Sequence, residues 1–228
     1  MVDIVDLLPD IPRWVEARHL VLKGEFEAFG LDTKPSLSVA LRDCETGGAF
    51  VVGRPSDEAV LAAVAGSKGD LIAGSEATAW LAELLPGWDF ERAVLYRAAN
   101  LNLPDLDGDV RLVDMSTIER FVAEPDLLEE LRDAADYTEI AASFVGEQPV
   151  AFCYSGTSTE TLWDVSIDTL EAFRRQGHAK RVAAFMIRRM EARGFRTLWG
   201  SLVSNTASWR LAQTLGFVPV DEIVIFQR

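Results

Sequence analysis

Cysteine, histidine and long apolar runs are scarce in this sequence, and each scarcity excludes a class of protein. Cys44 and Cys153 lie far apart and form no recognisable disulfide framework, so we expect a reducing compartment. Adding His19 and His178 produces no spacing that resembles a zinc site. No apolar run approaches the roughly 18 residues that a membrane-spanning helix needs. We therefore predict a soluble, cytoplasmic protein without a metal site.

Two segments that could indicate other classes lack the necessary residues. Residues 1–10 carry acids where a secretory signal peptide needs basic residues. The acidic segment 105–109 resembles the beginning of a calcium-binding loop, but its glycine comes too early, and Ser116 stands where the closing glutamate belongs. We therefore expect neither a signal peptide nor a calcium loop.

Basic residues are outnumbered, 22 against 36 acidic ones, and the formal net charge is −14. Nucleic acids and anionic membranes require a broad basic surface, so we expect neither as a partner. The positive charge is nevertheless uneven, because residues 172–196 hold eight of the 22 basic residues and a single acid, Glu191. Such a basic patch suits a compact anion. Its members are Arg174, Arg175, Lys180, Arg181, Arg188, Arg189, Arg193 and Arg196.

The first half of the chain alternates strands with helices. Ser56 is the expected N-cap of one of these helices and Gly66 its stop. The pattern predicts a small α/β layer. Residues 100–109 then break all periodicity with Pro, Gly, Asn and Asp, so we predict two domains, 1–105 and 106–228. The expected elements of the first are helices over 10–22, 55–66 and 75–85, and strands over 49–53 and 70–74.

The second half predicts a sheet with helices between its strands. Residues 161–170 form a strand in which Asp164, Ser166 and Asp168 share one face. The apolar positions of the following helix, expected to face the core, are Ala179, Val182, Ala183, Met186 and Met190. The expected strands cover 110–114, a hairpin over 139–156, 161–170, 197–203 and 217–227, and the expected helices cover 115–122, 125–137, 179–193 and 205–216.

The basic patch begins at a glycine turn between a strand and a helix. The strand ends near Leu170, and the helix begins near His178, where its first N–H groups have no intrahelical partner. Gly177 and the small Ala179 let a ligand approach the backbone closely. These features predict a phosphate or pyrophosphate pocket. Two alternatives stay open: an ordinary helix start, and a nucleotide site for which ATP would compete.

The turn resembles the signature of the GNAT superfamily of N-acetyltransferases. That signature is Arg or Gln, two residues, Gly, one residue, then Gly or Ala, and here it reads Arg174 to Ala179. A second motif of the family follows about 28 residues later, at Asn205, Ser208, Leu211 and Leu215–Phe217. The resemblance covers roughly residues 109–228 and is closest to a bacterial branch with an extra N-terminal domain.

The resemblance implies a fold, an acyl donor and a set of binding residues. The fold is α/β (α+β), with a mixed central sheet flanked by helices and preceded by a smaller α/β domain of unknown role. The donor is acetyl-CoA, whose pyrophosphate the turn would grip through backbone N–H groups. Backbone groups of the upstream strand would contact the pantetheine arm and the thioester. The implied binding residues are Ile167, Asp168, Thr169, Arg174, Arg175, Gln176, Gly177, His178, Ala179, Lys180, Asn205 and Ser208.

The implied reaction is direct attack of a small-molecule amine on the thioester. The candidates for general base are Asp164 and Glu139, with Asp168 behind them, although an acid at such a position is more often a solvated or salt-bridged surface residue. Many members carry a tyrosine seven residues after the asparagine to protonate the thiolate, and this chain has Ala212 there. Ser208 or water would substitute. An acyl-CoA-binding regulatory module with weak or no catalysis is therefore the alternative.

The remaining polar and aromatic residues are assigned plainer roles. Tyr154 is read as a packing residue of the sheet, and His178 as pointing to solvent with no catalytic part. Trp163 and Trp209 would pack or wall the acceptor site. The acidic balance favours a cationic acceptor. The N-terminal domain would cover the acceptor site or mediate pairing, which leaves a homodimer open.

Overall fold

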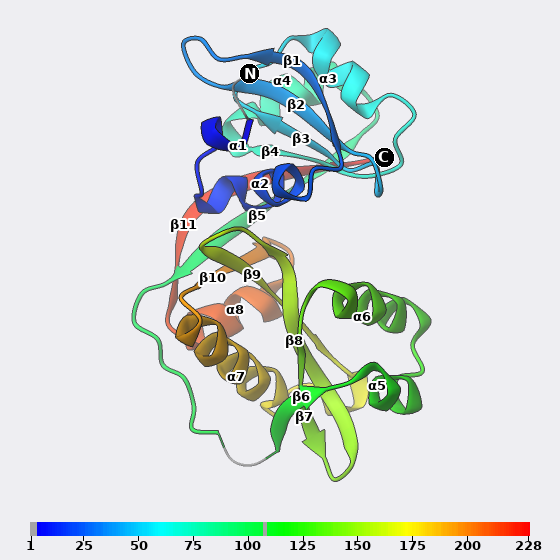
Figure 1. Cartoon of the computed structure of the whole chain (residues 1–228), viewed down its shortest axis with the longest axis vertical. Helices are drawn as coiled ribbons and strands as arrows, with labels where there is room; N and C mark the ends of the chain where they lie inside the picture. The colour runs from blue at the N-terminus through cyan, green and yellow to red at the C-terminus, as the bar shows by residue number, and fades with distance from the viewer. Residues whose placement is uncertain (1–3, 107–108) are drawn as a thin grey trace. The chain divides into compact units, whose positions relative to one another are not determined.

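The computed structural model describes residues 4–106 and 109–228, which form two compact units (Figure 1). The first unit holds the chain up to Leu95 together with Gly200–Trp209 and Pro219–Arg228, and the second holds Tyr96–Trp199 and Arg210–Val218. Contacts therefore assign the C-terminal segment 219–228 to the first unit. The two-domain boundary at residue 105 stays a prediction, because these units are not continuous in sequence.

The first unit is a sheet with helices on both faces. Its strands follow the order β1-β2-β3-β4-β11. Only β3 and β4 are parallel, as the connection through one helix requires, and the other neighbours are antiparallel. The strands are β1 (Phe26–Asp32), β2 (Ser38–Asp43), β3 (Ala49–Val52), β4 (Leu71–Gly74) and β11 (Phe217–Gln227), and most of β5 (Asp89–Ala98) also belongs to this unit, next to β11. The helices are α1 (Ile4–Leu7), η1 (Pro12–Trp14), α2 (Val15–Lys23), α3 (Asp57–Val64), η2 (Ser75–Ala77) and α4 (Thr78–Leu84).

Alternation along β2 divides the core of this unit between the two faces. Val39 and Leu41 join the cluster formed with α1 and α2, whereas Ala40 joins the cluster formed with α3 and α4. The predicted β-α-β-α pattern is confirmed in β3, α3, β4 and α4, and Ser56 caps α3 by accepting from Ala59 N. The sequence reading missed α1, β1, β2 and β5 (Asp89–Ala98). In β1 both faces are largely exposed, so it lacks the hydrophobic alternation that marks a strand.

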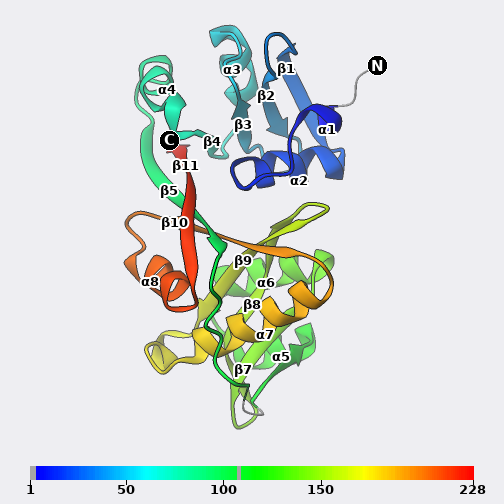
Figure 2. The ribbon, with the colours of Figure 1, turned by 90° about the vertical axis from the view of Figure 1, so that its left-hand side faces the viewer.

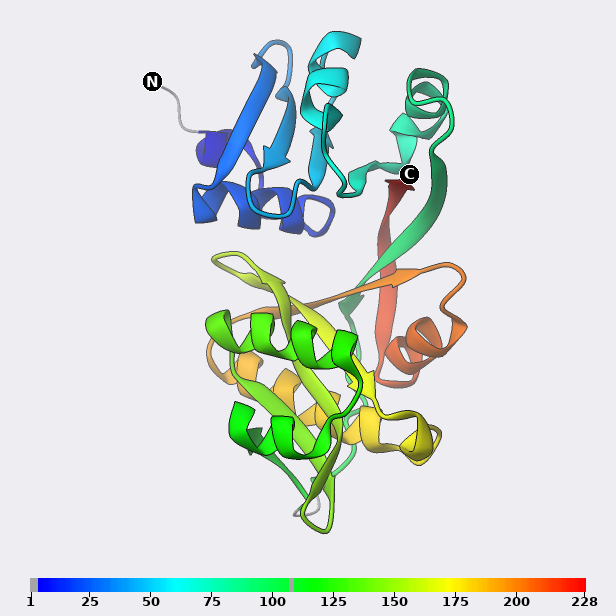
Figure 3. The ribbon, with the colours of Figure 1, turned by 90° about the vertical axis from the view of Figure 1, so that its right-hand side faces the viewer.

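The second unit is a mixed sheet that separates two layers of helices (Figures 2 and 3). Its order is β10-β9-β8-β7-β6, antiparallel except between β9 and β10. The strands are β6 (Val110–Val113), β7 (Ile140–Val145), β8 (Gln148–Ser158), β9 (Leu162–Thr169) and β10 (Arg196–Leu202). The helices are α5 (Met115–Phe121), α6 (Pro125–Tyr137), η3 (Glu171–Phe173), α7 (His178–Ala192) and α8 (Thr206–Thr214), of which residues 206–209 are assigned to the first unit.

Helices α5 and α6 cover one face of this sheet, and α7 covers the other (Figures 2 and 3). Phe152 and Tyr154 of β8 pack with α5 and α6. The buried side chains of α7 are His178, Val182, Ala183, Ala184, Met186, Ile187 and Met190. The predicted apolar stripe of α7 is confirmed except at Ala179, which is only half-buried because it lies in the exposed first turn.

Residues 99–106 follow β5 in the second unit and have no regular structure. Arg188 of α7 holds this segment by donating from Nη2 to the carbonyl of Pro104 at 2.9 Å. The rejected calcium loop at 105–109 includes residues 107–108, which lie outside the described residues. Within the described ranges, no three His, Cys, Asp or Glu side chains are placed to hold a metal ion. Over the same ranges, no helix is long and apolar enough to span a membrane.

Candidate functional site

Strand β9 loses its pairing with β10 several residues before β9 itself ends. Its parallel pairing with β10 covers Arg196↔Leu162 to Leu198↔Asp164, whereas its antiparallel pairing with β8 continues to Ala151↔Thr169. In the part of the chain that the structure describes, residues 165–169 of β9 therefore have a strand partner on one side only. Backbone groups on the other side are available to a ligand.

Hydrogen-bond alternation decides which residues face the open edge. Leu170 N donates to Val150 O at 3.0 Å, so every second residue of β9 before it bonds to β8, namely Asp168 and Ser166. Ile167 and Thr169 face the open edge instead. Arg174 supports this assignment, because its Nε donates to the outward carbonyl of Thr169 at 3.1 Å. The implied backbone role of Asp168 is thus wrong, since its main chain belongs to the β8 ladder.

The glycine turn has a backbone that bends twice into the left-handed region. Arg175 has φ 61° and Gly177 has φ 83°. Gln176 closes the loop from inside by donating from Nε2 to Ala172 O at 3.1 Å. A non-glycine residue in this conformation costs about 1–3 kcal/mol, and such strain concentrates at functional loops. Reversing the chain direction does not require this cost, so the conformation of Arg175 indicates a functional turn.

Six consecutive backbone N–H groups of the turn, from Arg175 to Lys180, have no protein acceptor among the described residues. The first helical bond of α7 comes only after them, from Arg181 N to Gly177 O at 3.2 Å. Residues 174–177 are exposed. A row of donors at the positive end of a helix, with arginine side chains beside it, matches an anion with several oxygens. The turn therefore offers the donors that the predicted anion site requires, and the binding of an anion there stays a prediction.

His178 lies beneath this row of donors rather than in solvent. The residue is 6% exposed, and Nδ1 lies 2.9 Å from Ser143 Oγ and 2.8 Å from Arg181 Nη2. Arginine only donates, so Nδ1 accepts and the neutral ring carries its proton on Nε2. Burial, and secondarily Arg181, lowers the pKa of His178. The solvent-facing prediction is wrong because the first turn of α7 lies against β7, where Ser143 is fully buried.

Glu139 is held by α7 and is not available as a base. Its carboxylate accepts two hydrogen bonds from Arg189, at 2.6 and 2.8 Å, and one from Arg193 at 3.1 Å. The bonds from Arg189 hold the pKa of Glu139 below its usual value. The candidate role of Glu139 is therefore corrected to an ion pair between the start of β7 and the C-terminal half of α7.

Asp168 belongs to a hydrogen-bonded group on the α5/α6 face. The phenol of Tyr154 lies 2.8 Å from Asp168 Oδ2 and 2.6 Å from Glu130 Oε1 of α6. Burial, followed by the two carboxylates, raises the pKa of Tyr154. Tyr154 is thus more than the packing residue expected. Sequence reasoning missed Glu130, whose only signal is its place beside the apolar positions Leu127 and Leu131 of α6.

The other candidates lie elsewhere in the chain. Asp164 is half-buried, on the last residue of β9 that pairs with β10. Asn205 accepts from Ser208 N at 3.1 Å and so caps α8. Asn205 and Ser208 belong to the first unit, whereas β9 and the turn belong to the second, so the structure does not join both motifs in one described site. Ala212 is fully buried and offers no proton donor.

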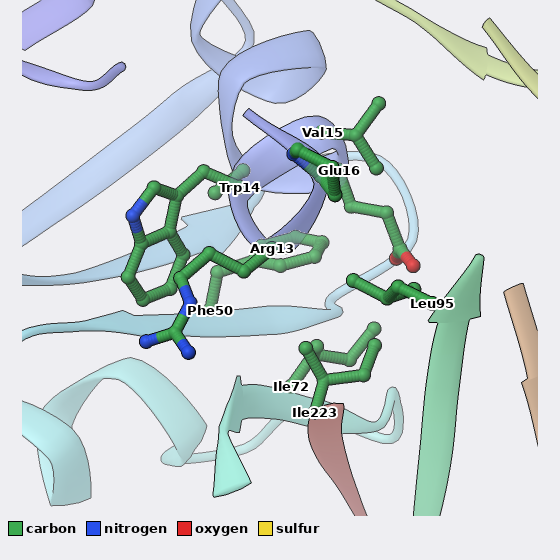
Figure 4. Close-up of a pocket in the computed structure, with 10 residues that line it drawn as sticks. Arg13, Trp14, Val15, Glu16, Phe50, Ile72, Leu95 and Ile223 are labelled. Carbon is green, nitrogen blue, oxygen red and sulfur yellow. The ribbon is translucent and has the colours of Figure 1, made fainter. Parts of the chain in front are cut away.

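A small cavity in the first unit is distinct from these residues (Figure 4). Its volume is about 10 Å³, which is room for one water molecule and not for a substrate. Arg13 at its rim is held by Asp221, with Nε 2.8 Å from Oδ2, and by Glu76 at 3.0 Å. The cavity is therefore a packing defect beside a structural ion pair. Its apolar walls include Trp14, Phe50, Ile72 and Ile223.

Comparison with solved structures shows the same fold over nearly the whole chain. A GCN5-related N-acetyltransferase-like protein from Streptococcus suis is 19% identical, with 98% of this chain and 96% of that chain covered and a TM-score of 0.68. A GCN5-related N-acetyltransferase from Kribbella flavida is 16% identical, with 94% and 93% covered and a TM-score of 0.64. These likenesses confirm the expected α/β GNAT fold.

Sequence comparison gives the family. The ribosomal protein bS18-alanine N-acetyltransferase of Haemophilus ducreyi is 35% identical over 68 residues, which are 29% of this chain and 46% of that relative. The match therefore spans less than half the length of that relative. The family model described as GNAT acetyltransferase matches residues 104–226, more than half of the 228 residues. On that match, this chain belongs to the GNAT acetyltransferase family, a family of transferases that use acetyl-CoA.

Proposed function

We propose that this protein transfers an acetyl group from acetyl-CoA to the amine of a small molecule by direct attack. The observation that carries this proposal is the row of backbone N–H groups at residues 175–180, beside the open edge of β9. Such a row of donors suits a diphosphate, and the unpaired strand edge offers backbone hydrogen bonds to the amide groups of a pantetheine arm. The family membership supplies the reaction class.

The turn and the strand edge have separate tasks in this proposal. The main chain from Arg175 to Lys180 binds the diphosphate, with the side chains of Arg174, Arg175 and Lys180 adding positive charge. The outward N–H groups of Ile167 and Thr169 orient the acyl end and stabilise the oxyanion that forms on attack. His178 holds the turn against β7 through Ser143. Holding amine and thioester in line can supply several kcal/mol of the barrier, about 7–11 in well-oriented systems.

The class of acceptor is proposed from charge. A net charge of −14 attracts cationic amines, and a small diamine carries both the charge and the nucleophile. The relative from Haemophilus ducreyi is named for acetylating an alanine of a ribosomal protein, so a peptide with an N-terminal alanine is the competing acceptor. The cytoplasmic location, the homodimer and the role of the N-terminal domain stay predictions.

Ala212 supports a second candidate. Its methyl group is fully buried, so the position that holds a proton donor in many members cannot protonate a thiolate here. The protein would then be a regulatory module that binds acyl-CoA with weak or no turnover. Coenzyme A thiolate is a good leaving group, so loss of this donor alone does not prevent the reaction.

Two measurements test the proposal and separate the candidates. Calorimetric titration with acetyl-CoA is expected to show binding that desulfo-CoA competes for and ATP does not. Absence of binding at millimolar concentration rejects both candidates. A screen of small amines and of an N-terminal alanine peptide, with detection of the free thiol, then distinguishes them. Turnover on a small amine supports the proposed enzyme. Turnover on the peptide alone makes the peptide the acceptor in place of a small amine. Binding of acetyl-CoA without turnover supports the regulatory module.

A further inference from the structure

Tyr154 of β8 places one phenol oxygen between two carboxylates. Its side chain is 2% exposed and lies on the face of the sheet that α5 and α6 cover. Glu130 approaches it from α6 at 2.6 Å, and Asp168 approaches it from β9 at 2.8 Å. Both distances lie within the range of O–H···O hydrogen bonds. We call these three residues the Tyr154 trio.

The phenol oxygen makes two short contacts with carboxylate oxygens, but the phenol has only one proton to donate. A phenol carries one O–H, and an ionised carboxylate carries none. While both carboxylates are ionised, Tyr154 donates to one, and the other turns lone pairs toward the phenol oxygen. One further proton on a carboxyl oxygen converts that contact into a second hydrogen bond. The trio is therefore arranged to take up one proton.

The phenol itself keeps its proton in this arrangement. Burial and the charges of Asp168 and Glu130, the two groups that act on it, raise the pKa of Tyr154. Tyr154 therefore acts as a bridge between the carboxylates and not as an acid. Asp168 is half-buried and Glu130 is exposed, so the proton that the trio takes up can enter from outside the core.

Asp168 also lies beside the edge that would hold the acyl donor. It stands between Ile167 and Thr169, whose backbone groups face the open side of β9. Its own side chain points to the α5/α6 face, because neighbouring residues of a strand point to opposite faces. A proton acceptor is thus one residue away from the proposed oxyanion donors. Glu139, in contrast, is occupied by Arg189 and Arg193.

We propose that Asp168 is the catalytic base of the acetyl transfer and that Tyr154 is a positioning residue that couples it to Glu130. The proposal rests on the function proposed above. The carboxylate of Asp168 takes one proton from the acceptor's ammonium group, and the freed amine forms the C–N bond at the thioester carbonyl. Collapse of the intermediate breaks the C–S bond, and the thiolate takes the second proton from the nitrogen. The proton on the trio returns to solvent.

Kinetics of the full chain test the assignment with acetyl-CoA and the amine from the screen that reacts fastest. Asp168→Asn is expected to lower kcat about 10²- to 10⁴-fold, the usual share of a general base, with calorimetric acetyl-CoA affinity unchanged. Tyr154→Phe is expected to lower kcat about tenfold and to shift the acidic limb of the kcat/KM pH profile. Tyr137→Phe, at the exposed end of α6, is the matched control and leaves both rate and profile unchanged.

A second measurement does not depend on turnover. Carbon-13 NMR of the side-chain carboxyl groups is expected to show that Tyr154→Phe shifts the signals of both Asp168 and Glu130, whereas Tyr137→Phe shifts neither. Asp168 and Glu130 signals that keep their wild-type positions in Tyr154→Phe overturn the coupling through the phenol, whether or not an acceptor has been found. Wild-type kcat in Asp168→Asn overturns the base, while acetyl-CoA binding in the same variant leaves the proposed function standing. Loss of acetyl-CoA binding in the wild type instead rejects the proposed function itself.

Discussion

At the scale of single residues, the turn before α7 depends on one glycine and one strained arginine. Gly177 adopts φ 83°, and a Cβ there would meet only Arg181 Nη1, at 3.4 Å, an ordinary contact. Gly194, just past the C-terminal end of the same helix, adopts φ 89° with nothing within 4 Å of an added Cβ. The two glycines thus have the same backbone demand, and only Gly177 lies where an anion would approach.

Gly177→Ala and Gly194→Ala are therefore expected to differ in binding and not in stability. Each forces an L-residue into the left-handed region, which lowers the free energy of unfolding by about 1–2 kcal/mol. Gly177→Ala additionally weakens acetyl-CoA binding about tenfold or more, because the methyl group displaces the anion from the N–H row. Urea unfolding and calorimetry measure the two effects. Equal acetyl-CoA affinity in both variants contradicts the role of the turn.

His178 makes the stability of the protein depend on pH. Its folded pKa is lowered, so between that value and the unfolded pKa of about 6.5 the unfolded chain binds more protons than the native one. The contribution of the neutral His178 ring to the free energy of unfolding is therefore fully present above about pH 6.5. The free energy of unfolding falls as the pH drops below that value. His178→Asn, which cannot titrate, should lack this part of the pH dependence. Urea unfolding from about pH 7.5 to 5.5 measures it; parallel curves for the two proteins count against the buried ring.

At the scale of elements, the open part of β9 is the feature that positions the site. Amide exchange can read its two sides separately, because Ser166 and Asp168 bond to β8 whereas Ile167 and Thr169 face outward. In the free protein we expect slow exchange at Ser166 and Asp168 and fast exchange at Ile167 and Thr169. Acetyl-CoA should slow the outward pair alone. Hydrogen exchange followed by NMR measures this, and protection of Ile167 before ligand is added contradicts the open edge.

Elements with strong local signals were predictable, and elements defined by their neighbours were not. The stripe of α7 and the cap at Ser56 come from spacing and side-chain chemistry, so both were confirmed. The polar, exposed β1 gave no signal, since its pairing with β2 is what makes it a strand. The same limit applies to Glu130, because only packing of α6 on β8 brings it to Tyr154.

At the scale of the whole molecule, the C-terminal strand completes the core of the first unit. Ile223–Phe226 of β11 pair with β4, and Val224 and Phe226 are fully buried in the cluster that α3 and α4 cover. A division at residue 105 would therefore remove two core side chains from the N-terminal part.

Residues 1–105 expressed alone are expected not to fold cooperatively. Loss of each large buried side chain costs about 2–5 kcal/mol, and the loss of two is comparable with the total stability of a small domain. The same residues with 219–228 joined after them through a flexible linker should recover cooperative unfolding. Circular dichroism during urea titration compares the two. Cooperative unfolding of residues 1–105 alone would support the boundary predicted from the sequence.

Local residues were enough to indicate the family and the chemistry of the turn, because the backbone donors before a helix follow from the segment Arg174 to Ala179. The tertiary structure sets the burial and the hydrogen-bond partners of the titratable groups. It buried His178 against Ser143, paired Glu139 with α7 and brought Glu130 and Asp168 to one phenol. These outcomes depend on which strands and helices meet. Burial and ion pairing depend on tertiary packing between these elements, so they cannot be derived from the spacing of residues along the chain.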